Sequence, residues 1–195
     1  MAFSTFPLFQ SHLDLAHSYW TRLIQKGDHV IDATAGNGHD TLKLATLALT
    51  ENSGFLWSLD IQQQALDNTL KLLTTHGSPT QNICLLNHNH STFPTFIPHN
   101  SIKLIVYNLG YLPGGNKNIT TQTNSTLQSI QNAQPLIQHG GAISITCYPG
   151  HTEGAHEQQQ ILQLTSPWNP KNWNITLHQF TNRQNSPSLL LIQKQ

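Results

Sequence analysis

The sequence predicts an α/β protein built on a doubly wound sheet, and three features of its pattern point to this fold class. Short apolar segments alternate with longer segments of helical periodicity along most of the chain. The first two apolar segments each reach an aspartate at their end, Asp32 and Asp60. The last two apolar segments follow each other without a helix, which is typical of an antiparallel pair. We therefore expect a Rossmann-like sheet that is mostly parallel, with one antiparallel edge strand.

Length and charge limit the classes of protein to which the chain can belong. It has 195 residues, the usual size of one domain, so residues 1–195 are expected to form a single domain. Only 9% of the residues are charged and the net charge is +0, whereas proteins that grip long nucleic acids are usually strongly basic. No segment is long enough for a membrane span, and the first ten residues lack a signal peptide's basic region. We expect a cytoplasmic protein, and a homodimer is compatible with the sequence.

The first half of the chain predicts a helix followed by two strand–helix units. Ser11 and Asp14 resemble a helix-capping box, and apolar residues then recur at helical spacing until Gly27, which predicts a helix over about 11–26. Gly77 closes the last helix of this half. The elements expected after the first helix are a strand at 29–33, a helix at about 39–50, a strand at 54–60 and a helix at 62–75.

The second half of the chain continues the alternation of strands and helices and then ends in two strands without a helix between them. Pro94 and Pro98 break the segment after the third strand into a loop, and a helix is expected to end near Pro135. A polar, glycine-rich stretch at 108–123 is too long to be a mere connector. The glycine pair at 140–141 is expected to introduce the fifth strand. The strands expected here lie at 82–86, 102–107 and 142–148, and a helix at 153–164 precedes a closing antiparallel pair at 174–181 and 188–193.

The turn after the first strand carries the first motif, Val-Ile-Asp-Ala-Thr-Ala-Gly-Asn-Gly-His-Asp at 30–40. Gly36 and Gly38 let the backbone approach a ligand where a Cβ would collide. Asp32 can accept a hydrogen bond from, or pair with, a positively charged ligand amine. A dinucleotide-binding fingerprint needs a third glycine, and Thr41 occupies that position. The turn alone is compatible with a structural connection, but beside Asp32 it favours a ligand site.

The second strand ends in Asp60, whose carboxylate can accept hydrogen bonds from both hydroxyls of an adenosine ribose. Asp32 and Asp60 lie about one strand–helix unit apart, and the carboxyl ends of parallel strands meet at one edge of a sheet. Either aspartate alone could be a solvated strand end. Because the chain has only 9 acidic residues, two such placements together favour a nucleoside site.

These two segments resemble the first and second motifs of class I S-adenosylmethionine-dependent methyltransferases. The string Asn-Leu-Gly-Tyr-Leu-Pro-Gly-Gly at 108–115 narrows the resemblance to the family named for rRNA methylation, as do Tyr-Pro-Gly-His at 148–151 and the ending at 182–187. The resemblance runs from Leu13 to Lys194. Members of that family methylate the aminomethyl group of wobble uridine in tRNA. The resemblance therefore implies the class I methyltransferase fold, an S-adenosyl-L-methionine cofactor and tRNA, held by its anticodon region, as the substrate.

The resemblance also implies which residues bind cofactor and RNA. The stretch at 88–90 occupies the place where such enzymes hold adenine, which Asn89 or His90 could contact. The residues expected to bind the cofactor are Asp32, Ala33, Thr34, Gly36, Asn37, Gly38, His39, Asp40, Asp60, Gln62, Asn89, His90 and Asn108. The residues expected to contact the tRNA are Gly110, Gly114, Gly115, Lys117, Thr120, Thr121 and His151.

Asn108 and Tyr111 have the same Asn-x-x-Tyr spacing as the Asn-Pro-Pro-Tyr loops of amino-group methyltransferases. A carboxamide oxygen can accept one hydrogen of a neutral amine and so present its lone pair to a sulfonium methyl. Tyr111 can stack on a base or close the pocket. A protonated amine must first lose a proton, and His151 and His90 are candidates for accepting it. The expected catalytic residues are Asn108, Tyr111 and His151.

Other functions stay open at this point. The methyl acceptor could be rRNA, a protein amide or a small amine. The missing third glycine and the lack of a Tyr-x-x-x-Lys motif disfavour a nicotinamide-dependent oxidoreductase, and the low basic content disfavours a non-enzymatic RNA-binding module. His88, His90, His151 and His156 could supply nitrogen ligands, but the sequence has no H-E-x-x-H helix and no cysteine pair with zinc spacing, so no metal is expected.

Overall fold

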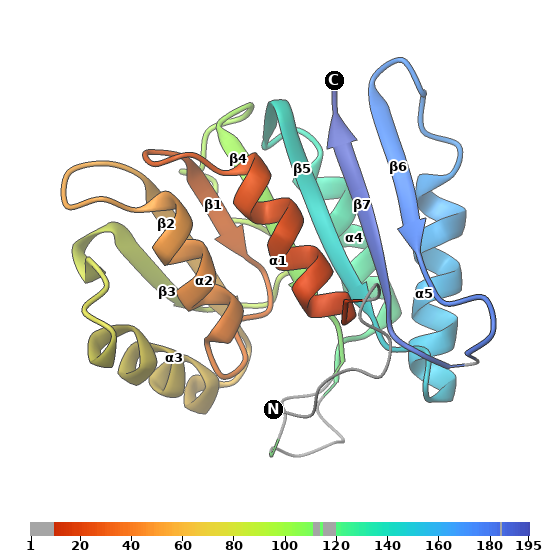
Figure 1. Cartoon of the computed structure of the whole chain (residues 1–195), viewed down its shortest axis with the longest axis horizontal. Helices are drawn as coiled ribbons and strands as arrows, with labels where there is room; N and C mark the ends of the chain where they lie inside the picture. Colours follow the sequence, from red (N-terminus) through yellow and green to blue (C-terminus); the bar gives the residue numbers. More distant parts are fainter. Residues whose placement is uncertain (1–9, 111–113, 115–119, 184) are drawn as a thin grey trace.

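The computed structural model describes residues 10–110, 114, 120–183 and 185–195, which form one seven-stranded sheet with the order β3-β2-β1-β4-β5-β7-β6 (Figure 1). The strands are β1 (His29–Asp32), β2 (Phe55–Asp60), β3 (Ile83–Asn87), β4 (Ile102–Asn108), β5 (Ile137–Cys147), β6 (Trp173–His178) and β7 (Ser188–Lys194). The helices are α1 (His12–Leu23), α2 (His39–Ala48), α3 (Gln63–Thr75), the short η1 (Thr80–Asn82), α4 (Thr123–Ala133) and α5 (Thr152–Thr165).

The direction of the chain across the sheet reverses beside β1. The strand β1 is parallel to both of its neighbours, β2 and β4. The chain runs outward from β1 through β2 to β3 and then crosses back to β4. Open α/β sheets bind ligands outside the carboxyl ends of the strands at such a reversal. The predicted α/β fold is confirmed, and its binding crevice belongs next to Asp32 and Asn108, where β1 and β4 end.

Helices cover both faces of the sheet: α1, α2 and α3 lie on one face, and α4 and α5 lie on the other (Figure 1). Val30 and Leu104 pack on the first face together with Trp20 of α1, whereas Ile31 and Ile105 pack on the second. The four strand residues are completely buried. Burial of both faces explains why the central strands read as continuous apolar runs in the sequence.

The first helix starts as the sequence predicts and ends earlier. Ser11 caps α1, since its side chain accepts a hydrogen bond from the Asp14 backbone N–H at 3.1 Å. The helix ends at Leu23 rather than near residue 26, because Ile24 already has an extended backbone with ψ 137°. Trp20 fixes α1 to the sheet: its indole Nε1 donates to Ser144 Oγ of β5 at 3.0 Å.

The start of β5 differs from the prediction. The strand was expected to begin after the glycine pair, but it begins at Ile137 and contains Gly140 and Gly141. A Cβ on Gly141 would lie 2.9 Å from the carbonyl oxygen of Ile102, and the pairing of β4 with β5 shifts register between Ile102 and Leu104. These glycines therefore mark an irregularity inside a strand, where two backbones approach closely, and not a turn before it.

The predicted closing pair is present, with β6 antiparallel to β7. The strand β7 is also antiparallel to β5, so it lies between β5 and β6, one position in from the edge of the sheet. The strand β6 ends at His178, three residues before the expected end. These two strands are remote from the crevice between β1 and β4.

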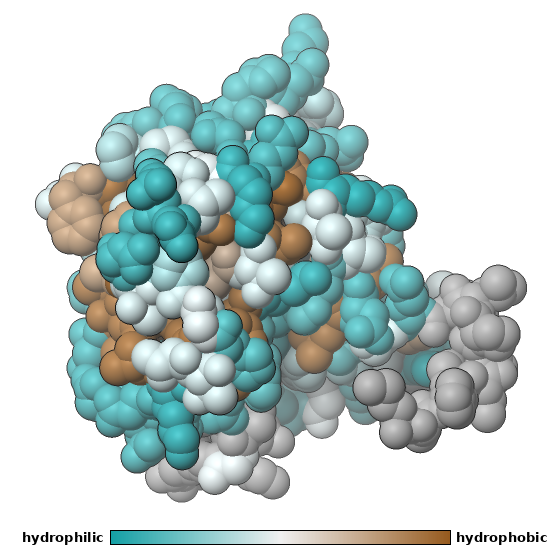
Figure 2. Space-filling view, turned by 60° about the vertical axis from the view of Figure 1, so that its left-hand side comes forward, coloured by the Kyte–Doolittle hydropathy of each residue, from teal (hydrophilic) through white to brown (hydrophobic). Residues whose placement is uncertain are grey.

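The surface is polar without being strongly charged. Figure 2, which brings the β3 side forward, shows hydrophobic residues as separate areas among polar ones. Because only 9% of the residues are charged, amide, hydroxyl and imidazole groups supply most of this polarity. None of the helices in the described ranges combines the length and the apolar character that crossing a bilayer requires.

Candidate active site

The turn between β1 and α2 is thin and is attached to β2. Gly38 caps α2 with a φ of 85°, and a Cβ at this position would lie 2.8 Å from the Thr69 Cα. Gly36 has a φ of 54°, and its N–H donates to Asp60 Oδ2 at 2.9 Å. The two glycines therefore let the turn lie directly against α3 while its backbone is held by the end of β2.

Asp32 supports this turn from inside the protein. Its side chain is 1% exposed; Oδ2 accepts from Thr41 Oγ1 at 2.6 Å and Oδ1 accepts from the Thr34 N–H at 3.1 Å. Burial, together with the nearby charge of Asp40, raises the pKa of Asp32 to about 7. This placement differs from the expectation that Asp32 presents a carboxylate to a ligand amine. The carboxylate that meets Asn108 is that of Asp40.

Asp60 has the placement that a ribose-binding carboxylate requires. It ends β2 and is half-buried. Its Oδ1 accepts from the Gln62 N–H at 2.8 Å and its Oδ2 accepts from the Gly36 N–H. Each carboxylate oxygen has a further lone pair, so both can still accept a hydroxyl. Next to it, Ile61 is a large apolar side chain that is 51% exposed, which sequence reasoning missed; an apolar residue directly after the strand-ending acid was the available signal.

The stretch after β3 divides into an exposed and a buried part. Asn89 is exposed, and its Oδ1 accepts from the Ser91 N–H at 2.9 Å. His90 is 8% exposed and lies edge-on to Tyr107, with 6.1 Å between the ring centroids. Its Nε2 is buried and has no hydrogen-bond partner among the described residues. Burial lowers the pKa of His90 to about 4, so this nitrogen is a weak proton acceptor and is better suited to a hydrogen bond.

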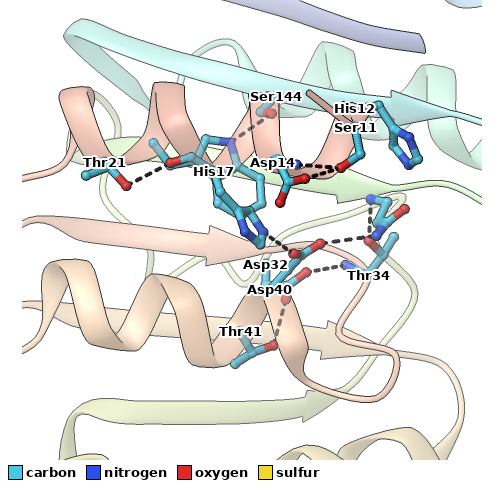
Figure 3. Close-up of polar contacts among 12 residues, drawn as sticks. Ser11, His12, Asp14, His17, Thr21, Asp32, Thr34, Asp40, Thr41 and Ser144 are labelled. Atoms are coloured by element: carbon cyan, nitrogen blue, oxygen red, sulfur yellow. Dashed lines mark hydrogen bonds and ion pairs between the residues drawn. The ribbon is translucent and has the colours of Figure 1, made fainter. Parts of the chain in front are cut away.

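Asn108 is held at both its backbone and its side chain. Its N–H donates to Thr34 Oγ1 at 2.7 Å, and its Nδ2 donates to Asp40 Oδ2 at 3.1 Å. The other oxygen of Asp40 is 2.8 Å from His17 Nε2 on α1. In Figure 3 the side chains of His17 and Asp40 meet, while Asp32 lies beside Thr34 and Thr41.

The glycine-rich segment after β4 has its two ends joined. The Gly110 N–H donates to Thr121 Oγ1 and the Thr121 N–H donates to the Gly110 carbonyl, both at 3.0 Å. Thr121 Oγ1 also donates to Glu157 Oε2 of α5 at 3.0 Å. Gly114 is exposed with a φ of 80°, and the Thr120 hydroxyl is buried without a partner among the described residues. The predicted site residues Tyr111, Gly115 and Lys117 lie outside the described residues.

His151 begins α5 instead of facing a buried pocket. It is exposed, and its Nδ1 accepts from the Gly154 N–H at 3.1 Å as the helix cap. Because Nδ1 accepts, the neutral ring carries its proton on Nε2, so His151 can take up a further proton only at Nδ1 and only by releasing the cap. The other cofactor candidates surround the turn: Ala33 is buried, Asn37 accepts from Asn68 Nδ2 at 3.1 Å, and His39 is exposed.

Four polar residues at the site were given no role from the sequence, although Tyr148 begins the string at 148–151. His12 and His17 come from α1, and His12 Nε2 lies 3.1 Å from the Tyr148 hydroxyl. Burial raises the pKa of Tyr148 to about 12. A hydrogen bond with the Asn108 side chain opposes this shift. The fourth is Glu157. His12, His17 and Glu157 are distant along the chain from both motifs, and no local pattern links α1 or α5 to the turn at 33–38.

Two hollows of the described surface lie elsewhere. One, of about 920 Å³, lies between α5 and the β6–β7 pair, and another, of about 320 Å³, lies between α1 and the same strands. Neither includes the glycine turn or Asp60. Within the described residues, no three His, Cys, Asp or Glu side chains come close enough to hold a metal ion.

Two solved structures share this fold and sheet along almost their whole length. A protein from Clostridium thermocellum, described as a putative rRNA-methylase, is 33% identical with a TM-score of 0.90, and the match covers 96% of this chain and 99% of that one. SMU.1697c from Streptococcus mutans, described as a putative methyltransferase in complex with SAH, is 28% identical with a TM-score of 0.84 and covers 96% and 99%. The fold and the site thus define an S-adenosylmethionine-dependent methyltransferase.

The sequence comparisons narrow this class to one family. The family model described as "Putative rRNA methylase" matches residues 56–194. A protein of Arabidopsis thaliana, the chloroplastic tRNA (mnm(5)s(2)U34)-methyltransferase, is 35% identical over 187 residues, which are 93% of this chain and 68% of that protein. The chain belongs to the Putative rRNA methylase family, and the resemblance inferred from its motifs is confirmed.

Proposed function

We propose that this enzyme transfers the methyl group of S-adenosylmethionine to the amine nitrogen of 5-aminomethyl-(2-thio)uridine at the wobble position of tRNA. The observation that carries the proposal is the orientation of the Asn108 carboxamide at the end of β4. Its Nδ2 donates to Asp40, so the oxygen of the same carboxamide is turned away from that carboxylate. An oxygen held in this way suits an N–H donor such as an amine. The named reaction of the Arabidopsis relative supports the same acceptor.

The residues of the crevice fit an adenosyl cofactor. Gly38 has no room for a Cβ, and Asp60 offers two unused lone pairs at the carboxyl end of β2. The buried Nε2 of His90, which has no partner within the described ranges, lies in the loop after β3, where a base could meet it. When bound, S-adenosylmethionine supplies a methyl group already activated by its sulfonium. We assign its binding to the turn at 33–39, to Asp60 and Gln62, and to Asn89 and His90; Asp40 and Asn108, which were also expected to bind it, are hydrogen-bonded to each other.

The protein then has to align and deprotonate the acceptor. Asn108 Oδ1 accepts one amine hydrogen, which orients the lone pair of the nitrogen. Alignment of this kind supplies roughly 7–11 kcal/mol of barrier reduction. Of the two histidines considered from the sequence, His90 is disfavoured as the base because burial lowers its pKa to about 4. His151 is exposed and is the remaining candidate, but it can accept the proton only at Nδ1, which then releases the Gly154 N–H.

We assign tRNA contact to the segment after β4, around Gly110, Gly114, Thr120 and Thr121, and to its neighbours Tyr111, Gly115 and Lys117. The joined ends of this segment lie next to Asn108, so an RNA strand held there would reach the carboxamide. With 9 Lys and Arg in the chain, a small patch of this kind is better suited to one nucleotide and its neighbours than to a long duplex.

The test is nucleoside mass spectrometry after incubating the purified enzyme with S-adenosylmethionine and tRNA that carries aminomethyluridine. We expect one added methyl group on that nucleoside and almost none with Asn108→Ala. Total rRNA is tested in parallel, because the description of the family names rRNA. Methylation of rRNA nucleosides instead, or of no RNA, would refute the assigned acceptor.

A further inference from the structure

Three side chains from three separate elements form a continuous polar chain that reaches the carboxamide of Asn108. His17 of α1 lies 2.8 Å from Asp40 Oδ1, and Asp40 of α2 accepts from Asn108 Nδ2 at 3.1 Å through its other oxygen. Asp40 is mostly shielded, with 12% of its side chain exposed, and His17 with 29%. The two residues are 23 positions apart and meet only because α1 packs beside α2 (Figure 3).

The chemistry of the central group fixes the direction of every hydrogen bond. A carboxylate can only accept, so His17 donates from Nε2 and Asn108 donates from Nδ2. The Asn108 carboxamide therefore cannot turn over without facing Asp40 with its own oxygen, which would place two acceptors together. Thr34 fixes the backbone of the same residue. As a result, Asn108 has one orientation, with its oxygen away from Asp40.

The helix that carries His17 is itself fixed in place. Trp20 lies three residues further along α1, on the same side of the helix, and its indole bonds to Ser144 of β5. The rings of His17 and Trp20 are in contact, with centroids 4.7 Å apart. The packing of Trp20 in the core thus fixes the position of His17. His17 in turn holds Asp40, and Asp40 holds the carboxamide of Asn108.

We propose that His17 and Asp40 are positioning residues for methyl transfer: Asp40, held by His17, keeps the carboxamide oxygen of Asn108 turned toward the acceptor amine. The inference rests on the proposed function, since it gives the Asn108 oxygen the task of receiving an amine hydrogen. Neither residue needs to touch the acceptor.

The experiment compares Asp40→Asn, His17→Phe and the double variant with wild type, using Asp67→Asn on α3 as a matched control; Asp67 is an exposed carboxylate that also accepts from an amide, that of Gln63. Asn at position 40 can offer either end of its amide, so Asn108 can turn over. We expect kcat to fall up to about 100-fold with little change in KM for tRNA or in the Kd for S-adenosylmethionine. The double variant should lose no more than Asp40→Asn alone, because His17 acts through Asp40. His17→Gln, which keeps an N–H donor, should lose less than His17→Phe.

A second readout does not depend on activity. In ¹⁵N-correlated NMR spectra, the side-chain amide of Asn108, assigned by its absence in Asn108→Ala, should shift and exchange faster in Asp40→Asn and His17→Phe. Additive losses of kcat, an unmoved amide signal, or a weakened cofactor Kd that accounts for the whole loss would each overturn the positioning role. If wild type methylates no tRNA, the proposed acceptor fails, and the amide signal still decides whether Asp40 orients Asn108.

Discussion

At the scale of single residues, Asp32 couples the site to pH. Its carboxyl group is 1% exposed, and burial raises its pKa from 3.8 to about 7, with hydrogen bonds from Thr41 and Thr34 opposing the shift. Its folded pKa is thus above its unfolded value, so the folded protein holds this proton more tightly. The resulting stabilisation is complete below the unfolded pKa and is lost as the pH rises through about 7.

Replacing Asp32 by Asn should remove this pH dependence. The amide oxygen can still accept from Thr34, and the Thr41 hydroxyl can turn to accept from the new amide while bonding to Ser58. The melting temperature of wild type should therefore fall relative to that of Asp32→Asn as the pH rises from about 4 to about 7, because over this range the unfolded chain has lost the Asp32 proton that the folded protein still holds. Calorimetry at both pH values checks this. Parallel curves for the two proteins would show that Asp32 does not titrate in this range.

Gly38 tests the closeness of the turn to α3. Its φ is 85°, and an added Cβ would lie 2.8 Å from the Thr69 Cα, whereas Gly77 has a φ of 64° with no atom within 4 Å. Gly77→Ala should cost about 1–2 kcal/mol from backbone strain alone. Gly38→Ala adds overpacking of about 1–3 kcal/mol and should weaken S-adenosylmethionine binding. Chemical denaturation and calorimetry measure both effects, and equal losses in the two variants would contradict the close approach.

The residue scale also shows the limit of sequence reasoning about the site. Asp60 was predicted at a strand end, and the structure places it there with free lone pairs. Asp32 was also predicted at the correct strand end, but its carboxylate contacts Thr34 and Thr41 inside the protein. The sequence could not reveal this, because a pattern of residue types does not say which way a side chain turns. The pairing of His17 with Asp40 needs the packing of α1 on α2, which no local motif encodes.

At the scale of elements, α1 connects the sheet to the site. Trp20 is 3% exposed and bonds to Ser144, and the same helix carries His12 and His17. A change at Trp20 thus alters both the packing of the helix and the position of the two histidines. The sequence predicted this helix from its cap and its periodicity, but gave no reason to connect it with Asn108.

Trp20→Ala should destabilise the protein by about 3–5 kcal/mol, the cost of emptying a large core site. Trp20→Phe removes part of the buried ring and the bond to the buried Ser144, which should cost about 1–3 kcal/mol. Methyl transfer should fall in the same order at a temperature where both variants are folded. Full activity in folded Trp20→Ala would show that α1 does not position the site.

The helix α5 anchors the segment after β4 through Glu157. This residue is 4% exposed, its Oε2 accepts from Thr121 and its Oε1 from Thr126, and burial raises its pKa. Glu157→Ala leaves two hydroxyls without an acceptor and should cost on the order of 2–3 kcal/mol. We expect KM for tRNA to rise and the Kd for S-adenosylmethionine to stay unchanged. Glu153→Gln is the control on the same helix; a loss confined to cofactor affinity would rule out this anchoring role.

The strands show where local signals succeed and where they mislead. The central strands are apolar on both faces and were all predicted within a few residues. The start of β5 was wrong because Gly140 and Gly141 look like a turn in the sequence, although they allow β4 and β5 to approach across an irregular pairing. Register depends on the partner strand, so the sequence of β5 alone could not reveal it.

At the scale of the whole molecule, ligand binding should stabilise the fold. A ligand that binds only the folded state at a concentration of about 100 times its Kd contributes about 2.7 kcal/mol. For a chain of this size, that corresponds to a rise in melting temperature of about 5–11 °C. We expect this rise with S-adenosylmethionine and a smaller one with Asp60→Asn. A thermal-shift assay provides the measurement, and an unchanged melting temperature at saturating concentration would contradict cofactor binding.

The position of β7 has a consequence for synthesis. Residues 188–194 leave the ribosome after all the other strands, yet they lie between β5 and β6 and are the strand with which β6 pairs. A nascent chain therefore keeps the outer edge of β5 open until translation reaches these residues. Open strand edges are where chains associate with one another. The yield of soluble protein, more than the stability of the finished fold, is the property that sequence changes in this late strand would affect first.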